Sequence, residues 1–175
     1  MWEALLHMKN LKRYLIIIMK KKVRVKMKTV YDFVCEFQKK YPGSVTWWRN
    51  KKHCKVIEKY LNPGETVTFA FAAQKTNKPI DFFTHVFALT NKRILIGRKR
   101  VFFGHFLSSV TPDLFNDLEV YRGLFWGQIR IDTVKELIEF SGISKKGLDE
   151  IETHVSDFVI REKRRYGMHQ RPKSE

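Results

Sequence analysis

The feature that most constrains the fold is a change of hydrophobic period at Gly64. After this residue, apolar and polar side chains alternate in short runs as far as Phe140, and turn residues separate the runs. In the first run every second residue from Val67 to Ala73 is apolar, which is typical of a β-strand with one face on a core. Before Gly64 and after Phe140 the apolar residues return at helical spacing. The chain is therefore expected to combine a central β-domain with flanking helices.

Seven antiparallel strands are predicted from this pattern. Asn91 favours a tight hairpin because Asn tolerates the left-handed conformation, and Pro112 marks a crossing between sheets. Four strands followed by three predict a two-sheet barrel or sandwich, with residues 98–100 as the turn between the third and fourth strands. The predicted strands are residues 66–74, 82–90, 93–97, 101–107, 117–124, 128–133 and 136–140.

A final amphipathic helix completes the β-domain. Its apolar stripe comprises Leu148, Ile151, Val155, Phe158 and Val159. An antiparallel barrel of seven strands has an open mouth, and one helix laid over it buries both the stripe and the opening. The domain is predicted to span residues 62–166 and to be mainly β, within a chain that is α+β overall.

Two helices precede the strands and are expected to form a helical flap over residues 27–61. The first shows apolar residues at Val30, Phe33, Val34, Phe37 and Tyr41 and is ended by Pro42-Gly43. The second takes its apolar contacts from Trp48, Cys54, Ile57 and Leu61.

Positive charge is concentrated at the two ends of the chain. The net charge is +16, of which residues 1–26 hold +7 and residues 161–175 hold +4. The apolar run from Tyr14 to Met19 is too short to span a bilayer, and Lys20 follows where a signal peptide needs small residues. Residues 1–26 are either a basic amphipathic segment for an anionic membrane or a non-native start before Met27, and residues 167–175 are expected to be a disordered basic tail.

The sequence shows no catalytic or cofactor motif. It contains no G-x-S-x-G, no phosphate-binding G-x-x-x-x-G-K-[ST] loop and no H-E-x-x-H. Cys35 and Cys54 are nineteen residues apart without a zinc-type spacing, and His85 and His105 are interpreted as structural. We therefore expect a non-enzymatic protein with no metal and no cofactor, and the cysteine usage favours the reducing cytoplasm.

Three motifs then indicate a family. They are Tyr60-Leu61-Asn62-Pro63-Gly64-Glu65, Leu89-Thr90-Asn91-Lys92-Arg93-Ile94-Leu95 and Gly123-Leu124-Phe125-Trp126-Gly127-Gln128-Ile129. In this order and spacing the chain resembles the bacterial pleckstrin-homology (PH) domains, most closely the YokE-like group, over about residues 58–165. The resemblance implies a PH-like fold and a binding or adaptor role towards lipid, peptide or protein.

One basic rim is the predicted binding site. The turns after the first and third strands of a meander emerge at the same end, so their five cations should gather there: Lys75, Lys78, Arg98, Lys99 and Arg100. Converging Lys and Arg side chains suit phosphate oxygens, so an anionic lipid headgroup at the inner face of the membrane, or an acidic protein, is the expected partner. The predicted second strand, residues 82–90, lacks the cations of inositol-phosphate binders.

Two other functions remain open. The basic residues at both termini, including Arg161 to Arg165, fit sequence-independent nucleic-acid binding. Exposed aromatic anchors at Trp47, Trp48 and Trp126 would instead indicate a protein-interaction module, whereas burial between flap and barrel would not.

Overall fold

The structure, a computed structural model, describes residues 27–44, 49–76 and 83–169, with side chains described as far as Arg165. Its elements, in chain order, are α2 (Val30–Lys40), α3 (Asn50–Lys59), β1 (Val67–Lys75), β2 (Thr84–Thr90), β3 (Ile94–Lys99), β4 (His105–Val110), the 3-10 turn η1 (Pro112–Leu114), β5 (Phe115–Arg122), β6 (Gly127–Thr133), β7 (Leu137–Ile143), the 3-10 turn η2 (Lys145–Gly147) and α4 (Leu148–His169). Within the described ranges, no helix is long and apolar enough to cross a bilayer.

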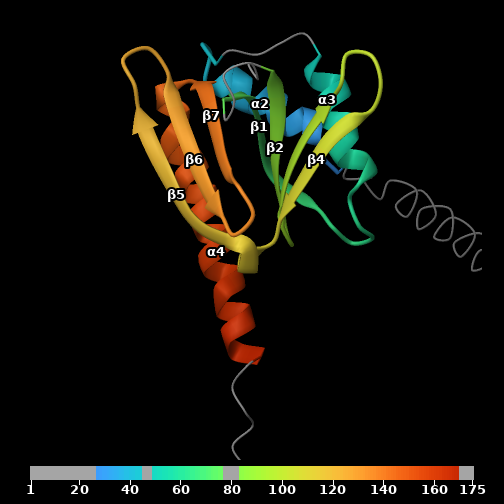
Figure 1. The fold of residues 1–175 in the computed structure, drawn as a ribbon, viewed down its shortest axis with the longest axis vertical. Helices are drawn as coiled ribbons and strands as arrows, with labels where there is room; N and C mark the ends of the chain where they lie inside the picture. The colour runs from blue at the N-terminus through green and yellow to red at the C-terminus, as the bar shows by residue number, and fades with distance from the viewer. Residues whose placement is uncertain (1–26, 45–48, 77–82, 170–175) are drawn as a thin grey trace, which may run out of the picture.

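The seven strands form one antiparallel sheet in the order β4-β3-β2-β1-β7-β6-β5, folded so that its two halves face each other (Figure 1). The predicted seven-stranded antiparallel fold with a C-terminal helix is confirmed. The two groups of strands are not separate sheets, however. The end of β1 pairs with β7 through Gln74 with Ser141 and Lys75 with Phe140, and these two pairs join the halves. β1 pairs with β2 along one edge and, at its end, with β7 along its other edge, so it belongs to both halves of the sheet.

The main core lies between the two halves of the sheet and α4. Phe71 and Phe87 stack with ring centroids 4.9 Å apart, and Phe140 from β7 meets Phe87 edge to face. The helix contributes the whole predicted stripe, since Leu148, Ile151, Val155, Phe158 and Val159 are all buried. α4 packs on η1, β5 and β6 and then extends past the lower end of the sheet (Figure 1).

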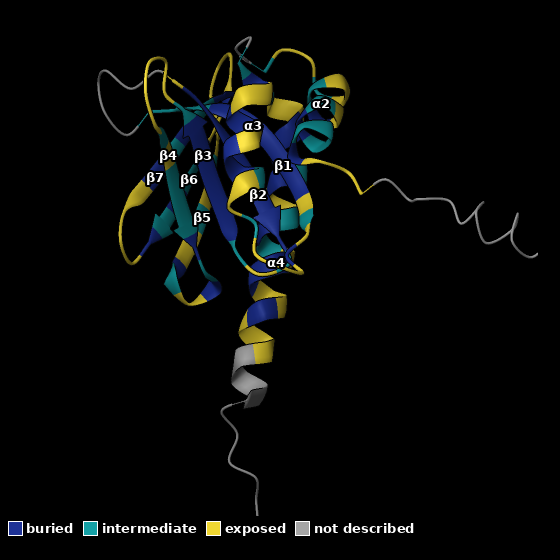
Figure 2. Cartoon of the chain, turned by 90° about the vertical axis from the view of Figure 1, so that its right-hand side faces the viewer, coloured by how far each residue is buried: buried dark blue, intermediate teal, exposed yellow. Residues whose placement is uncertain are grey.

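The N-terminal helices, predicted as a flap over residues 27–61, pack on the sheet as a third layer. They cover the outer face of β1, β2 and β3, and Figure 2 shows these strands buried beneath them. Small residues allow this close approach: Ala70, Ala72 and Ala88 lie under the helices, and all are buried. Phe37 of α2 also reaches the main core, where its ring lies 5.7 Å from that of Phe69.

Several predicted boundaries are wrong: the fifth strand ends at Arg122 and not at residue 124, and the seventh runs to Ile143 and not to residue 140. Arg98 and Lys99 belong to β3 and pair with β4, so the chain turns after Arg100 and not at residues 98–100. The turn is apolar, and its hydrophobicity made residues 101–104 look like strand. In addition, α4 runs to His169, into the segment 167–175 that was predicted as disordered. Residues 1–26 and 170–175, for which predictions were made, lie outside the described residues.

Candidate binding surface at one end of the sheet

The β3–β4 hairpin carries an exposed apolar tip. Val101, Phe102 and Phe103 form this β3–β4 tip, and the two Phe residues are 86% and 87% exposed. The backbone N–H of Arg100 donates to the carbonyl of Gly104 at 3.2 Å, which closes the turn, and Gly104 adopts a positive φ of 75°. The fold therefore holds two Phe rings out into solvent on a closed hairpin.

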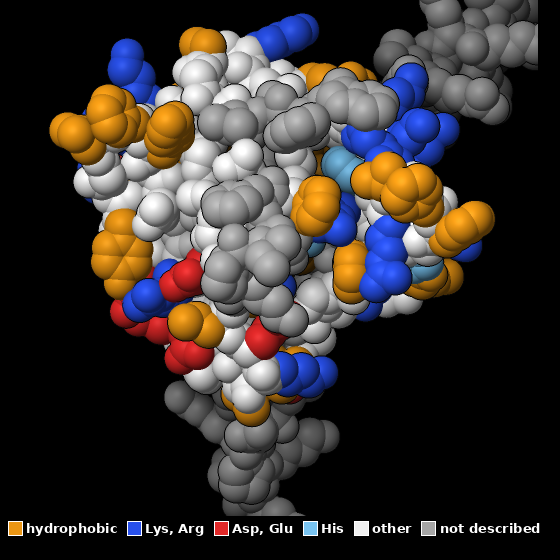
Figure 3. Space-filling view, turned by 45° about the horizontal axis from the view of Figure 1, so that its top comes forward, with side chains coloured by type: hydrophobic (Ala, Val, Ile, Leu, Met, Phe, Trp, Pro, Cys, Tyr) orange, Lys and Arg blue, Asp and Glu red, His pale blue; other side chains and the backbone are white. Residues whose placement is uncertain are grey.

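The β5–β6 hairpin carries a second apolar tip at the same end of the molecule (Figure 1). Leu124, Phe125 and Trp126 form this β5–β6 tip and are 82%, 77% and 46% exposed. The Gly123 N–H donates to the Trp126 carbonyl at 3.0 Å, and the Lys145 ammonium donates to the Leu124 carbonyl at 3.0 Å. Figure 3 shows hydrophobic side chains gathered at both sides of this end, with Lys and Arg side chains beside the group at the right.

Two of the predicted rim cations are engaged within the protein. The Lys75 ammonium lies 3.2 Å from the carboxylate of Glu136, which also accepts from the Ser108 hydroxyl. Lys75 thus ties β1 to the β6–β7 turn and to β4. The Arg98 guanidinium is buried and lies 4.0 Å from the centroid of the Phe83 ring and 5.2 Å from that of Phe106.

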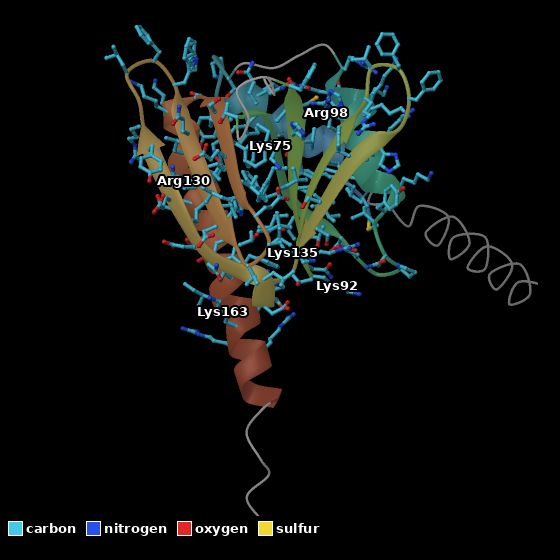
Figure 4. All side chains as sticks on the ribbon, viewed as in Figure 1. Lys75, Lys92, Arg98, Arg130, Lys135 and Lys163 are labelled. Carbon is cyan, nitrogen blue, oxygen red and sulfur yellow. The ribbon has the colours of Figure 1, made fainter. Side chains whose placement is uncertain are left out.

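The other two described rim cations lie at the base of the β3–β4 tip. Arg100 is exposed, with its guanidinium 4.1 Å from the Phe106 ring centroid on the strand opposite. Lys99 is partly exposed and lies on the side towards α3. Figure 4 labels Lys75 on β1 and Arg98 on β3, and β2 lies between these two strands, whereas Lys78 lies outside the described residues.

Of the three predicted aromatic anchors, the structure describes only Trp126. Trp126 is nearly half exposed at the β5–β6 tip, beside Phe125, whose ring centroid is 5.8 Å away. It is not packed between the helical layer and the sheet. Trp47 and Trp48 lie outside the described residues.

Sequence reasoning missed a basic groove between α3 and the β3–β4 hairpin. It occupies about 470 Å³ beside the β3–β4 tip, and its cationic lining comes mostly from α3. The signal was present in the sequence as Lys52, Lys55 and Lys59, which recur at helical spacing. Only the fold brings Lys99 opposite them.

The first two motifs that indicated the family meet at the opposite end of the sheet from the tips. Glu65 is buried and accepts from Arg93 at 3.0 Å and from the Thr90 hydroxyl at 2.8 Å. Asn91 accepts from the Thr66 N–H and donates to the Gly64 carbonyl. Burial alone would raise the pKa of Glu65, but the hydrogen bonds from Arg93, the Asn62 N–H and Thr90 leave this pKa below its ordinary value. The contacts of Glu65 and Asn91 therefore stabilise the fold at this end of the sheet.

Residues 61–157 match the family model described as the bacterial PH domain. The chain therefore belongs to the bacterial PH-domain family. No curated protein matches the chain. Among solved structures, it is similar to a pleckstrin-homology domain from Shewanella amazonensis at 12% identity, over 61% of this chain and 94% of that one, with a TM-score of 0.44. It is also similar to a DUF1696-family protein with a pleckstrin-homology domain from Shewanella loihica at 16% identity, over 61% and 86% of the two chains, with a TM-score of 0.40.

Family membership gives a general role. PH domains are generally binding modules without catalytic activity, so a binding role towards lipid or protein fits this bacterial PH domain.

His85 and His105, which the sequence indicated as structural residues, each have a hydrogen-bond partner within the protein. His85 Nδ1 lies 2.9 Å from the Phe83 carbonyl, and His105 Nε2 lies 2.7 Å from the Tyr60 hydroxyl.

Proposed function

We propose that this bacterial PH domain is a non-enzymatic membrane-binding module that docks on anionic lipid through its two apolar hairpin tips. The observation that carries the proposal is their position: both tips lie at one end of the molecule, so one flat surface reaches both (Figure 1). Exposed apolar patches of this kind mark interaction sites, and aromatic side chains favour the membrane interface.

Positive charge next to the tips favours an anionic surface over a neutral one. Arg100 lies at the base of the β3–β4 tip, and Lys145 is bound to the backbone of the β5–β6 tip. Each basic side chain near an anionic leaflet contributes about 1 kcal/mol of attraction. We retain the predicted basic rim as the headgroup contact: Lys75, Lys78, Arg98, Lys99 and Arg100. Within it, Lys99 and Arg100 are best placed to reach a headgroup, because they lie at the base of the β3–β4 tip.

The cellular setting and the subfamily belong to the same proposal. Cys35 and Cys54 are both free thiols, which suits a reducing compartment, so the membrane face would be the cytoplasmic one. The closer likeness to the YokE-like group rests on the three sequence motifs that end at Glu65, Leu95 and Ile129.

Vesicle sedimentation with the full chain tests the proposal. The wild type should bind phosphatidylglycerol vesicles and bind phosphatidylcholine vesicles much less. A variant with Phe103→Ser and Phe125→Ser should bind the anionic vesicles about tenfold more weakly, since each ring loses its burial in the interface. The matched control is Val134→Ser with Ile160→Ser, which removes two side chains that are 65% and 51% exposed but lie away from the tips.

The control variant should bind within about twofold of the wild type, because neither side chain reaches a surface docked at the tips. Equal binding by the tip variant and the wild type would contradict the proposal, as would equal binding to both kinds of vesicle. A duplex-DNA titration on the same proteins separates the nucleic-acid alternative. Salt-sensitive DNA binding with no vesicle binding would overturn the membrane function.

A further inference from the structure

The basic groove has the charge of an anion site, and one of its two walls, α3, lies outside the segment that matches the family. It runs between α3 and the β3–β4 hairpin, whereas the family match begins at residue 61. Its positively charged lining is Arg49, Lys52, Lys55, Lys59 and Lys99, and none of the described residues that line it is acidic. The groove is therefore a feature that this chain adds to the PH fold.

The spacing of α3 places three of its lysines on one face. Lys52, Lys55 and Lys59 follow at i, i+3 and i+7, so they share the side of the helix that faces the hairpin. The other side of α3 carries Cys54 and Ile57, which are fully buried against the sheet. Packing thus fixes which side of α3 points into the groove.

Three contacts hold the two walls of the groove together. The Arg49 guanidinium donates to the Arg100 carbonyl at 3.1 Å, and the Lys99 N–H donates to Nδ1 of His53 at 2.9 Å. At the far end the Tyr60 hydroxyl lies 2.7 Å from His105 Nε2. The groove is therefore built by side chains at its beginning, middle and end.

Close packing between α3 and β3 also holds the two walls together. A Cβ on Gly97 would lie 2.7 Å from Cγ1 of Ile57, so only glycine at this position lets α3 approach β3 so closely.

Within the described ranges, the lysines of the groove have no acidic partners. No carboxylate in the described part of the chain lies within ion-pair distance of Lys52, Lys55, Lys59 or Lys99. Like charges three and four residues apart on a helix destabilise it by a few tenths of a kcal/mol per pair. An anion between the walls would reduce that repulsion, and a phosphate group offers several acceptor oxygens to the ammonium groups that line the groove.

We propose that this groove binds a phosphate group that is attached to a small organic part. The volume of about 470 Å³ exceeds that of a single phosphate, and Val56, Tyr60, Val101 and Phe102 supply an apolar part of the lining. Because Phe102 belongs to both the groove and the β3–β4 tip, a lipid headgroup would reach the groove when the tip is in a membrane. A free phosphate ester would reach it without one, so the inference goes beyond the proposed membrane function.

The test compares two probes on the full chain. Glycerol 3-phosphate is titrated while the Lys99 backbone amide is followed by NMR, and phosphatidylglycerol vesicles are used in sedimentation. The groove variant is Lys52→Ser with Lys55→Ser. The matched control is Lys163→Ser with Arg164→Ser, which removes the same charge from exposed positions on α4 (Figure 4 shows Lys163).

The groove variant should lose about tenfold in affinity for a probe that binds in the groove, and the control variant should lose less than about twofold. Loss with both probes identifies a site for free phosphate esters as well as lipid, and loss with vesicles alone identifies a headgroup site. No difference between groove and control variants with either probe overturns the inference.

The two proposals fail separately. The variant with Phe103→Ser and Phe125→Ser should still bind glycerol 3-phosphate, so failure of the tips would leave the groove supported by the soluble probe. Conversely, vesicle binding that depends on the tips, together with no effect of the Lys52 and Lys55 changes on either probe, would overturn the groove and leave the membrane function standing.

Discussion

At the scale of single residues, His53 connects the stability of the fold to pH. Its imidazole is buried and accepts the Lys99 N–H, which requires an unprotonated Nδ1. Burial lowers the pKa of His53 to about 4, and the nearby charges of Arg49, His85 and Arg98 act in the same direction. The folded protein therefore resists the proton that the unfolded chain takes up near pH 6.5.

We predict that stability falls as the pH drops from about 6.5 towards 4. In that window the unfolded state binds more protons, so the contribution of His53 is complete above pH 6.5 and is lost on acidification. Between pH 7.5 and 5.0 the loss should be about 2 kcal/mol. Urea unfolding of the wild type and of His53→Asn at both pH values measures it, because Asn keeps an acceptor but does not titrate. An equal pH dependence in the two proteins would show that His53 is not the titrating group.

Among the ion pairs of the described residues, we expect Glu65–Arg93 to contribute most to the free energy of unfolding. The side chain of Glu65 is fully buried and its partner Arg93 is only 19% exposed, so removing the carboxylate leaves a largely buried guanidinium without its partner. Glu65→Ala should lower the free energy of unfolding by about 3 kcal/mol, measured by urea unfolding at pH 7.5. Glu36→Ala is the control, since the Lys28–Glu36 pair is 54% exposed on both sides and should change stability by less than about 1 kcal/mol. Similar losses for the two variants would contradict this role for Glu65.

At the scale of elements, the sequence predicted best where one face of a strand is polar or where a helix has one apolar stripe. The alternation from Gln128 to Thr133 and the stripe on α4 both led to the correct elements. The β3–β4 turn was misplaced because Arg98 and Lys99 look like turn residues while Val101 to Phe103 look like strand. Local hydrophobicity cannot separate a buried strand from an apolar tip, since only tertiary packing decides which side chains are covered.

The candidate site shows the same limit. The end of the sheet where Lys99 and Arg100 lie could be predicted from strand direction alone. The pairing of Lys75 with Glu136 and the stacking of Arg98 on Phe83 could not, because each joins residues that are far apart in sequence. The groove needed both a helical period, visible at Lys52, and a helix docked on β3, which is not visible in the sequence.

At the scale of the whole molecule, the N-terminal helices decide where the folding unit begins. The family match starts at residue 61, and the sequence suggested a separate domain over residues 62–166. In the structure, α2 and α3 bury the outer face of β1 to β3, including Val86, Ala88 and Leu95. Without these helices that apolar face would be open to water, which soluble domains rarely tolerate.

We therefore predict that a fragment of residues 61–175 does not form a stable fold, whereas a fragment of residues 27–175 does. The longer fragment keeps every contact of α2 and α3, including the Thr29–Asp32 capping box, and should unfold in one cooperative transition. The shorter one exposes the outer face of the sheet and also loses Phe37 from the main core, so it should aggregate or bind a hydrophobic dye. Circular dichroism melting and dye fluorescence on both fragments measure this. A cooperative melt of the shorter fragment would show that the matched segment folds alone and that the helices only cover it, in which case the groove between α3 and β3 would be an accessory built on an independent PH domain.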